Sequence, residues 1–296
     1  KTNIICSEKY IYGKKRRVMQ CHCGGGFRNL NSGISYSCNS YFAMAFRTTI
    51  ENTPDASKAM DNWSNHIKSF GLGNFLGNDL SVGKKGNIPD GDYYNKWYPD
   101  FQWGATTIIS NAIGQGEILV TPIQLANMTA AIANKGYYYT PHIIKSIDDE
   151  AINPNFLTPK QTSINPEYFE PVIEGMHNVY TKGTASFLKV PGIEICGKTG
   201  TAENFTKIDG VRQQLTDHSI FVAFAPKDDP EIAIAILVEN GYYGSRWAGR
   251  IASLMIEKYL KGEVTLKRME RLVIEKSLED EYLKPYRGNA FESNDK

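Results

Sequence analysis

Apolar side chains recur at helical spacing through much of the first 180 residues, which predicts a helix-rich first part. A capping box opens one helix at 121–124, where Thr, Pro and Gln occupy the positions that favour a helix start, and Gly136 closes it. A further helix is predicted from Pro166 to Tyr180. Another lies between Asp55 and Phe70 and ends at Gly71, with one apolar side formed by Met60, Trp63, Ile67 and Phe70.

The pattern changes to strands in the last third of the chain. Strands are predicted at 192–201, 218–225 and 231–239. The third alternates with period two, at Ile232, Ile234, Ile236 and Val238. We interpret the polar stretch at 204–214 as a loop between the first two strands. Apolar residues at helical spacing between Arg246 and Leu260 predict a helix that packs on this sheet.

Three stretches lack either pattern. Residues 1–36 are polar, with Gly24-Gly25-Gly26 among them, and favour short strands and loops. Residues 72–118 are rich in Gly, Asn, Asp and Tyr, which predicts a long irregular excursion of a kind that is uncommon unless functional. From Leu266 the chain is charged with sparse apolar residues, which indicates a peripheral helix and a frayed tail.

Composition sets the class of protein before any motif is considered. A hydrophobic content of 41% is enough for a substantial core, and 33 Lys and Arg residues nearly balance 32 Asp and Glu residues. The net charge of +1 gives no general attraction to an anionic membrane or to nucleic acid, and we expect no nucleic-acid partner. No apolar run approaches the roughly 18 residues of a membrane span. Function must therefore be sought in individual sites.

Two short motifs stand in the order that penicillin-recognising serine enzymes use. Ser37-Cys38-Asn39 fits Ser-x-Asn, and Lys198-Thr199-Gly200 fits the later Lys-Thr/Ser-Gly. Each is weak alone, because a Lys-Ser/Thr-Gly triplet occurs by chance in roughly one chain of this length in ten. Ser37 and Asn39 would also suit the caps of a helix that begins near Ser40. Their order along the chain is what favours a catalytic role.

The first motif of that group, Ser-x-x-Lys, has no counterpart ahead of Ser37. The match at Ser81-Val82-Gly83-Lys84 comes later, in a stretch dense in Gly and Asp. We interpret it as a surface loop, because a nucleophilic serine needs a rigid helical start to hold its lysine one turn away. The nucleophile is therefore expected before Lys1, which makes this chain a fragment that should be inactive by itself.

Longer stretches around these motifs resemble the class B penicillin-binding proteins and, within them, the elongation-type penicillin-binding protein 2 group. They lie in family order across residues 35–226 and are Ser37-Cys38-Asn39-Ser40-Tyr41-Phe42, Ile113-Gly114-Gln115-Gly116, Thr121-Pro122-Ile123-Gln124-Leu125-Ala126, Gly183-Thr184-Ala185, Gly197-Lys198-Thr199-Gly200-Thr201-Ala202 and His218 through Pro226. The shared order carries the resemblance, since any one stretch would be weak.

The resemblance implies an α+β fold of the penicillin-binding transpeptidase, or β-lactamase-like, type. Such a fold has a five-stranded, mostly antiparallel sheet flanked by helices, together with an all-helical lobe. On this basis residues 1–262 should form part of a transpeptidase domain, and residues 263–296 a C-terminal helix and tail. Residues 1–34 should cover the Ser-x-Asn turn, which would lie in the cleft between sheet and lobe.

The implied activity is peptidoglycan D,D-transpeptidation, in which stem peptides are cross-linked during cell elongation through an acyl-serine that penicillins also form. By this resemblance Ser37 would relay protons, and Asn39 would bind the backbone of the donor peptide. Lys198 would attract the terminal carboxylate of that peptide. The residues that follow would bind the carboxylate, admit the peptide to the strand edge and supply half of an oxyanion hole: Thr199, Gly200 and Thr201.

The resemblance also implies partners and a location, and two other functions remain open. It implies no cofactor for catalysis, substrates ending in D-Ala-D-Ala, inhibition by β-lactam antibiotics, and contact with the glycan polymerase of the elongation complex through the parent protein. The domain would lie at the periplasmic face of the inner membrane, with an anchor in the missing N-terminal part. The alternatives are a serine β-lactamase-like hydrolase, which would need a water-activating base, and a non-catalytic scaffold or sensor.

The cysteines are distributed unevenly, with four before residue 40 and Cys196 near the second motif. Some members of the resembled group hold zinc beside the Ser-x-Asn turn through its middle cysteine, here Cys38. Residues 1–38 could complete a structural zinc site with four thiolates, with His22 as a substitute for a neighbour: Cys6, Cys21, Cys23 and Cys38. Disulfides and free thiols remain alternatives, because Cys21-x-Cys23 is tighter than usual zinc spacing. Cys196 is expected to pack in the sheet core.

Overall fold

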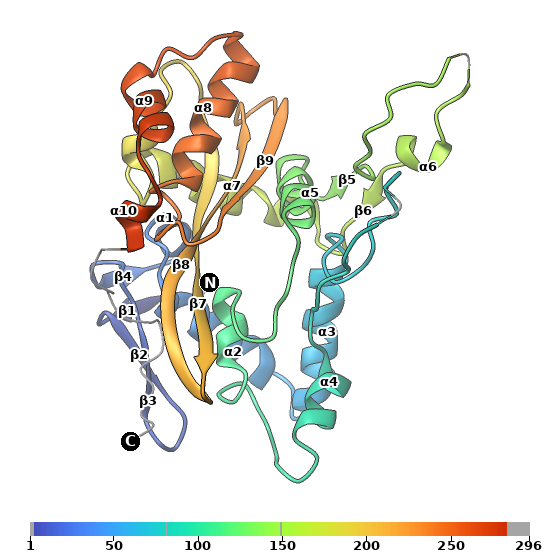
Figure 1. Ribbon diagram of the computed structural model, residues 1–296. Helices are drawn as coiled ribbons and strands as arrows, with labels where there is room; N and C mark the ends of the chain where they lie inside the picture. Colours follow the sequence, from blue (N-terminus) through green and yellow to red (C-terminus); the bar gives the residue numbers. More distant parts are fainter. Residues whose placement is uncertain (1–2, 81, 149, 283–296) are drawn as a thin grey trace.

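A computed structural model describes residues 3–80, 82–148 and 150–282 (Figure 1). The long β7–β8 hairpin and the helices beside it form one side of the molecule, and α3 and α4 stand on the other side. Helices and antiparallel strands are segregated along the chain, so the α+β class predicted from the sequence is confirmed. Among the described residues, every helix falls short of the length and apolar content that crossing a membrane requires.

The central sheet of the described residues has three antiparallel strands, β7 (Cys196–Ile208), β8 (Val211–Ala225) and β9 (Ile232–Val238), in the order β7-β8-β9. Five strands were expected. That number came from the family resemblance, whereas the alternating pattern itself indicates these three. β7 therefore forms an edge of the described sheet, and one side of its backbone is open to other groups.

The loop predicted at 204–214 is wrong, because β7 and β8 continue through it as a paired ribbon. Their register runs from Cys196 opposite Phe224 to Ile208 opposite Val211, with an irregularity between Ala202 and Asn204. Asp209 and Gly210 form the turn, with φ of 52° and 79°. Positive φ at both turn residues suits the twist of a two-residue hairpin, and Asp-Gly is a favoured pair there. The exposed ribbon carries polar residues on both faces, which hid its alternation.

Two of the helices that pack against the sheet are joined by a hydrogen bond. They are α7 (Glu170–Thr181), preceded by η2 (Pro166–Tyr168), and α8 (Ala248–Lys261), so the predicted helices near 166–180 and 246–260 are confirmed. The Tyr180 hydroxyl lies 3.0 Å from Ser253 Oγ and joins them. The core between sheet and helices includes Ile173, Leu188, Ile195, Phe221, Phe224 and Ile256, all at most 2% exposed.

A second core belongs to the helical lobe. The lobe contains α2 (Asn39–Glu51), α3 (Ala56–Lys68), α4 (Gly91–Trp97) and η1 (Ile109–Ile113). The helix that follows the predicted capping box, α5 (Pro122–Ala133), packs against β8 and β9. The buried residues of the lobe include Phe46, Ile50, Met60, Tyr94 and Ile108. The stretch 72–118 is thus less irregular than predicted, since Asp90 caps α4 by accepting from the Tyr93 N–H.

Short elements complete the described chain. The first residues form the antiparallel pairs β1 (Ile4–Cys6) with β4 (Gly26–Arg28) and β2 (Lys9–Tyr12) with β3 (Arg17–Gln20), as predicted, and then α1 (Leu30–Ser35). The remaining elements are β5 (Tyr137–Tyr138), α6 (Pro154–Leu157), β6 (Lys160–Gln161), η3 (Ser186–Leu188), α9 (Lys267–Glu275) and α10 (Glu279–Tyr282). The tail predicted beyond residue 282 lies outside the described residues.

Candidate active site

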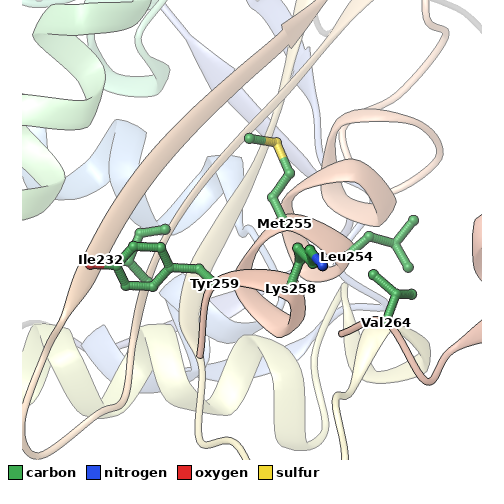
Figure 2. A pocket seen from close by; sticks show the side chains of 6 residues that line it. All are labelled: Ile232, Leu254, Met255, Lys258, Tyr259 and Val264. Atoms are coloured by element: carbon green, nitrogen blue, oxygen red, sulfur yellow. The ribbon is translucent and has the colours of Figure 1, made fainter. Parts of the chain in front are cut away.

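Two hollows in the described surface differ in chemistry. The smaller, of about 400 Å³, is lined by Ile232 of β9 and by residues of α8 and the loop after it, which are Leu254, Met255, Lys258, Tyr259 and Val264 (Figure 2). Its walls are largely apolar. The larger, of about 1160 Å³, is lined by all six residues assigned to catalysis or substrate binding from the sequence: Ser37, Asn39, Lys198, Thr199, Gly200 and Thr201. The larger hollow is therefore the candidate site.

Ser37 is held in a left-handed backbone conformation at the end of α1. Its φ is 53°. Its N–H donates to the Ile34 carbonyl at 3.1 Å, and the Cys38 N–H donates to the Gly33 carbonyl at 2.8 Å. This is the Schellman pattern, whose left-handed residue is usually glycine because a Cβ is unfavourable there. A serine in this place indicates that its hydroxyl has a role.

The hydroxyl of Ser37 meets the ammonium group of Lys198 on the opposite wall. Lys198 Nζ donates to Ser37 Oγ at 2.7 Å and to the Thr199 carbonyl at 2.8 Å. Burial lowers the pKa of Lys198 to about 8, because an ammonium group loses favourable hydration away from water. Lys198 is therefore a cation at neutral pH that loses its charge as the pH rises through about 8.

Neither Ser37 nor Asn39 caps α2 with its side chain. The N-cap of α2 is Cys38, which makes no side-chain capping bond, and Asn39 is the first helical residue. The Asn39 amide group instead donates through Nδ2 to the Gln20 carbonyl at 2.9 Å, where β3 ends. Helix capping therefore does not explain why Ser and Asn occupy these two positions.

The residues after Lys198 present their backbone to the open edge of β7. In an antiparallel pair, every second residue of a strand directs its N–H and C=O away from the partner strand. Such residues of β7 direct both groups to the open edge. The Thr199 carbonyl accepts from Lys198 Nζ, and the Thr201 carbonyl accepts from Gln115 Nε2 at 3.3 Å. A Cβ on Gly200 would lie 3.2 Å from Ile220 Cβ, so glycine fits closely beside β8.

Thr184 is a residue of the site that was not assigned from the sequence. Its Oγ1 lies 3.0 Å from Thr199 Oγ1, and its N–H donates to the Ser35 carbonyl at 3.2 Å. The preceding Gly183 lies so close to α1 that a Cβ there would be 2.2 Å from the Ser35 oxygen. This loop therefore connects the end of α1 with β7. Both residues belong to the Gly-Thr-Ala stretch that carried the resemblance, so the signal was present in the sequence.

Carboxyl groups line the part of the cavity next to the hairpin. Burial, with a smaller contribution from nearby Glu203, raises the pKa of Asp217 to about 6. Gln214 Nε2 donates to Asp217 Oδ1 at 3.1 Å, and Arg212 forms an ion pair with Glu203 at 3.3 Å. Glu203 and Asp217 flank the stretch 204–214, which was predicted to be a loop, and neither was assigned to the site from the sequence.

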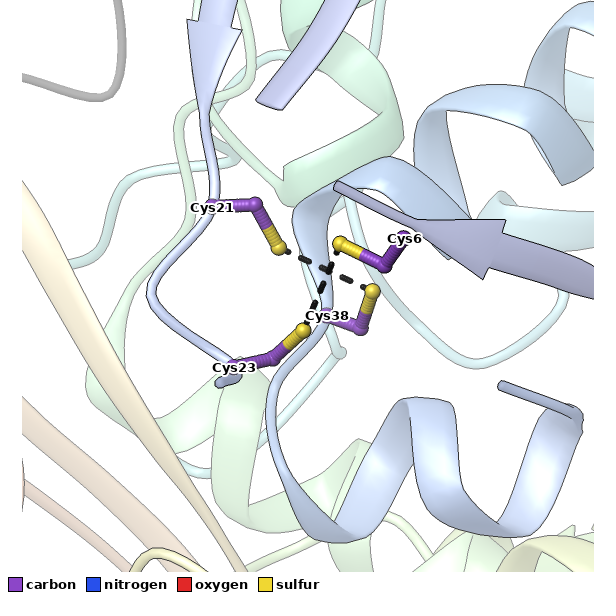
Figure 3. A group of neighbouring side chains, drawn as sticks. All are labelled: Cys6, Cys21, Cys23 and Cys38. Carbon is purple, nitrogen blue, oxygen red and sulfur yellow. Dashed lines mark hydrogen bonds between the residues drawn. The ribbon is translucent and has the colours of Figure 1, made fainter. Parts of the chain in front are cut away.

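The four early cysteines form one buried group (Figure 3). One of them, Cys38, lies between Ser37 and Asn39 in the sequence. The Sγ atoms of the group all lie within 4.8 Å of one another, with separations of 3.5 Å for Cys6 to Cys23 and 3.6 Å for Cys21 to Cys38. A disulfide bond is about 2.05 Å long, and all five cysteines are free thiols here. Cys196 is buried in the sheet core, as predicted.

Two other residues considered from the sequence lie elsewhere. His22, the alternative ligand, lines the large cavity and is not part of the four-thiol group. Ser81 lies outside the described residues. Its neighbours Val82 and Lys84 are exposed and belong to no helix or strand, in agreement with the predicted surface loop.

Comparison with known proteins decides the family. The family model described as "Penicillin binding protein transpeptidase domain" matches residues 1–257. The chain belongs to this family. The peptidoglycan D,D-transpeptidase MrdA of Haemophilus influenzae is 30% identical over 256 residues, which cover 80% of this chain and 37% of MrdA. The chain thus spans little more than a third of that relative's length.

Solved structures confirm the penicillin-binding transpeptidase fold. PBP2 of Pseudomonas aeruginosa, in complex with WCK 5153, is 27% identical with a TM-score of 0.71, and the match covers 90% of this chain and 56% of the PBP2 chain. PBP2 of Helicobacter pylori, in complex with MreC, is 27% identical with a TM-score of 0.68, and the match covers 88% of this chain and 45% of the PBP2 chain. The predicted resemblance to the penicillin-binding protein 2 group is confirmed.

Proposed function

We propose that this chain supplies the substrate-binding half of a peptidoglycan D,D-transpeptidase site that cross-links stem peptides during cell elongation. The supporting observation is the contact between Lys198 Nζ and Ser37 Oγ at 2.7 Å, which joins the two family motifs across a 1160 Å³ cavity beside an open strand edge. A proton-relaying hydroxyl next to a cation is the arrangement that acyl transfer to and from a serine needs.

The proposed roles follow from the chemistry of each group. Lys198 attracts the terminal carboxylate of the donor peptide, while Ser37 passes protons between the nucleophile side and the leaving amine. Asn39, oriented by the Gln20 carbonyl, offers its amide oxygen to the peptide backbone. The outward backbone and hydroxyls of the edge strand bind the carboxylate and stabilise the oxyanion: Thr199, Gly200 and Thr201.

The serine that becomes acylated is proposed to come from a Ser-x-x-Lys motif that these 296 residues do not place ahead of Ser37. Labelled penicillin tests the whole assignment. A version extended upstream through that motif should form a stable acyl-enzyme, and the 296-residue chain alone should not. Rapid release of hydrolysed penicillin by the extended version would indicate a lactamase instead. No reaction of the extended version would indicate a scaffold or sensor.

We further propose that the four-cysteine group holds a structural zinc ion. Four thiolates around zinc at about 2.3 Å give sulfur separations of about 3.8 Å, close to the 3.6 Å of Cys21 to Cys38 and the 3.5 Å of Cys6 to Cys23. The group would fix the segment before Ser37 and contribute no catalytic step. Mass spectrometry of purified protein should find one zinc per chain, which Cys23→Ser should lose and Cys196→Ala should keep. A ratio near zero in unaltered protein prepared without chelators would refute the site.

Partners and location are proposed from the relatives. Residues 1–262 would act as part of the transpeptidase domain, with 263–296 as an appended helix and tail. We expect β-lactams to acylate the whole protein, as its membership of a penicillin-binding family suggests. We also propose that it works at the periplasmic face of the inner membrane, in an elongation complex with a glycan polymerase. Co-purification of the polymerase with the whole protein tests this.

A further inference from the structure

One side chain from the helical lobe already occupies the open edge of β7. Gln115 donates from Nε2 to the Thr201 carbonyl at 3.3 Å, across 86 residues of sequence. Both residues line the large cavity. The donor is a primary amide, which resembles the peptide N–H that an extended substrate would present to the same edge. This contact joins the lobe directly to the proposed substrate-binding strand.

The loop that carries Gln115 has a backbone that places it there. Gly114 and Gly116 on either side are both left-handed, with φ of 73° and 75°. The Gly114 N–H donates to the Asn111 carbonyl at 3.1 Å and ends η1, and the Gln115 N–H donates to the Ser110 carbonyl at 3.1 Å. A Cβ on Gly116 would lie 2.4 Å from Ser110 Oγ. The loop is therefore tightly folded around Gln115.

A buried polar network holds the base of this loop. Asn111, 3% exposed, donates from Nδ2 to the Tyr94 hydroxyl at 2.6 Å. The same hydroxyl donates to Glu117 Oε2 at 2.8 Å, on the other side of the Gly-Gln-Gly segment. Both ends of the loop are thus tied to one tyrosine of the lobe core. The backbone at Gln115 is therefore held by hydrogen bonds other than its side-chain contact with β7.

The Thr201 carbonyl is a hydrogen-bond acceptor that an incoming peptide needs. A peptide that adds to the edge of a sheet pairs its N–H groups with the outward carbonyls of the edge strand. In the structure that acceptor is already paired with Gln115. A ligand with an amide N–H at this position must therefore compete with Gln115, whereas a ligand without one has nothing to gain from displacing it.

Building on the transpeptidase function proposed above, we propose that Gln115 is a placeholder for the substrate amide on the Thr201 carbonyl and so sets the selectivity of the site among acylating ligands. Displacement by the matching N–H of a stem peptide exchanges one neutral hydrogen bond for another. The exchange costs little for a correct ligand. Because an amide-bearing ligand gains no net hydrogen bond in this exchange, Gln115 lowers the advantage that such a ligand has over one that lacks the amide.

Acylation rates of the whole protein, including its Ser-x-x-Lys serine, test this inference. Benzylpenicillin carries an amide N–H on its side chain, and a carbapenem with a hydroxyethyl group does not. Gln115→Ala should raise the second-order rate constant for benzylpenicillin about fivefold, the size expected for one neutral hydrogen bond, and leave the carbapenem rate unchanged. Gln115→Met, which keeps the length of the side chain without a donor, should behave in the same way.

Controls separate this inference from the function on which it rests. Gln213 is an exposed glutamine of the β7–β8 hairpin that does not line the cavity, and Gln213→Ala should change neither rate. Equal loss of both rates in the Gln115 variants would make Gln115 a structural support, and loss for benzylpenicillin alone would make it a ligand contact. An unchanged ratio would mean that both donors share the carbonyl. Each of these refutes the placeholder while the transpeptidase stands. No acylation of the unaltered protein refutes both.

Discussion

The two walls of the cleft are built by different means. On one wall, Lys198 to Thr201 take their places from the register of β7 with β8, which fixes each residue opposite a known partner. On the other wall, Ser37 occupies a single left-handed position between two helices, held by the end of α1 and by contacts with residues distant in sequence. A strand can position several groups by repetition, whereas a turn positions one group and depends on its surroundings.

The strand wall carries the charge, so its loss should have the largest effect. Lys198→Met in the whole protein should lower acylation by labelled penicillin roughly 10³-fold, because the cation that attracts the carboxylate is gone. The unaltered protein should lose rate as the pH rises through about 8, where Lys198 deprotonates. Lys198→Arg should move that loss to higher pH. The exposed Lys189→Met is the control, and a Lys198→Met variant with normal rates would contradict the assignment.

The contact between the walls should be the next most sensitive feature. An added methyl group in Gly183→Ala would meet the Ser35 oxygen at 2.2 Å and the Val179 Cα at 2.8 Å. We expect a loss of about 3 kcal/mol in the free energy of unfolding, measured with urea, because backbone and helix must move apart. Gly104→Ala, where a Cβ meets nothing within 4 Å, should leave the free energy almost unchanged. Similar curves for both variants would show that the loop yields easily.

The turn wall separates backbone strain from chemistry. Both Ser37→Gly and Ser37→Ala lose the hydrogen bond from Lys198, but Ser37→Gly should have a free energy of unfolding about 0.5 to 1 kcal/mol higher than Ser37→Ala, since glycine accepts the left-handed position. Ser37→Gly should nevertheless lower acylation about 10²-fold through loss of the relay hydroxyl. Ser37→Ala should lose the same rate. Thermal melts and penicillin labelling of both variants measure this. If Ser37→Gly kept full activity, the hydroxyl would have no catalytic part.

The smallest effect is expected at the hairpin rim. Asp217 in an unfolded chain ionises near pH 3.9, but burial raises the pKa of the folded carboxyl to about 6. Between these values the folded protein binds more protons, so stability should fall as the pH rises from about 4 to 6 and stay lower above that. Asp217→Asn should remove this slope and add about 1 kcal/mol at pH 7, allowing for partial exposure. Urea unfolding of the unaltered protein and of Asp217→Asn at four pH values measures this difference. Parallel profiles of stability against pH for the two proteins would contradict the prediction.

Sequence reasoning did best where chemistry and structure repeat along the chain. The capping box of α5 and the alternation of β9 depend on neighbours in sequence, and the structure confirms both elements. The order of the two motifs indicated a shared site, and the structure places both motifs in one cavity. Sequence reasoning did worst on the outer half of the β7–β8 hairpin. There most side chains are exposed and apolar residues such as Phe205 and Ile208 fall on opposite faces, so the pattern shows no single apolar face, and the pair Asp209-Gly210 was the one local cue.

The sequence by itself determined the family motifs, their order and most of the regular elements, because capping, periodicity and turn preferences act over a few residues. The tertiary structure alone decided that Lys198 reaches Ser37 across 161 residues and that Thr184 and Gln115 join the site. It also gathered four cysteines, which come from β1 (Cys6), from the segment between β3 and β4 (Cys21 and Cys23) and from the turn before α2 (Cys38). These arrangements arise from the packing of the sheet against the helices, and such packing couples positions whose separation in sequence carries no local signal.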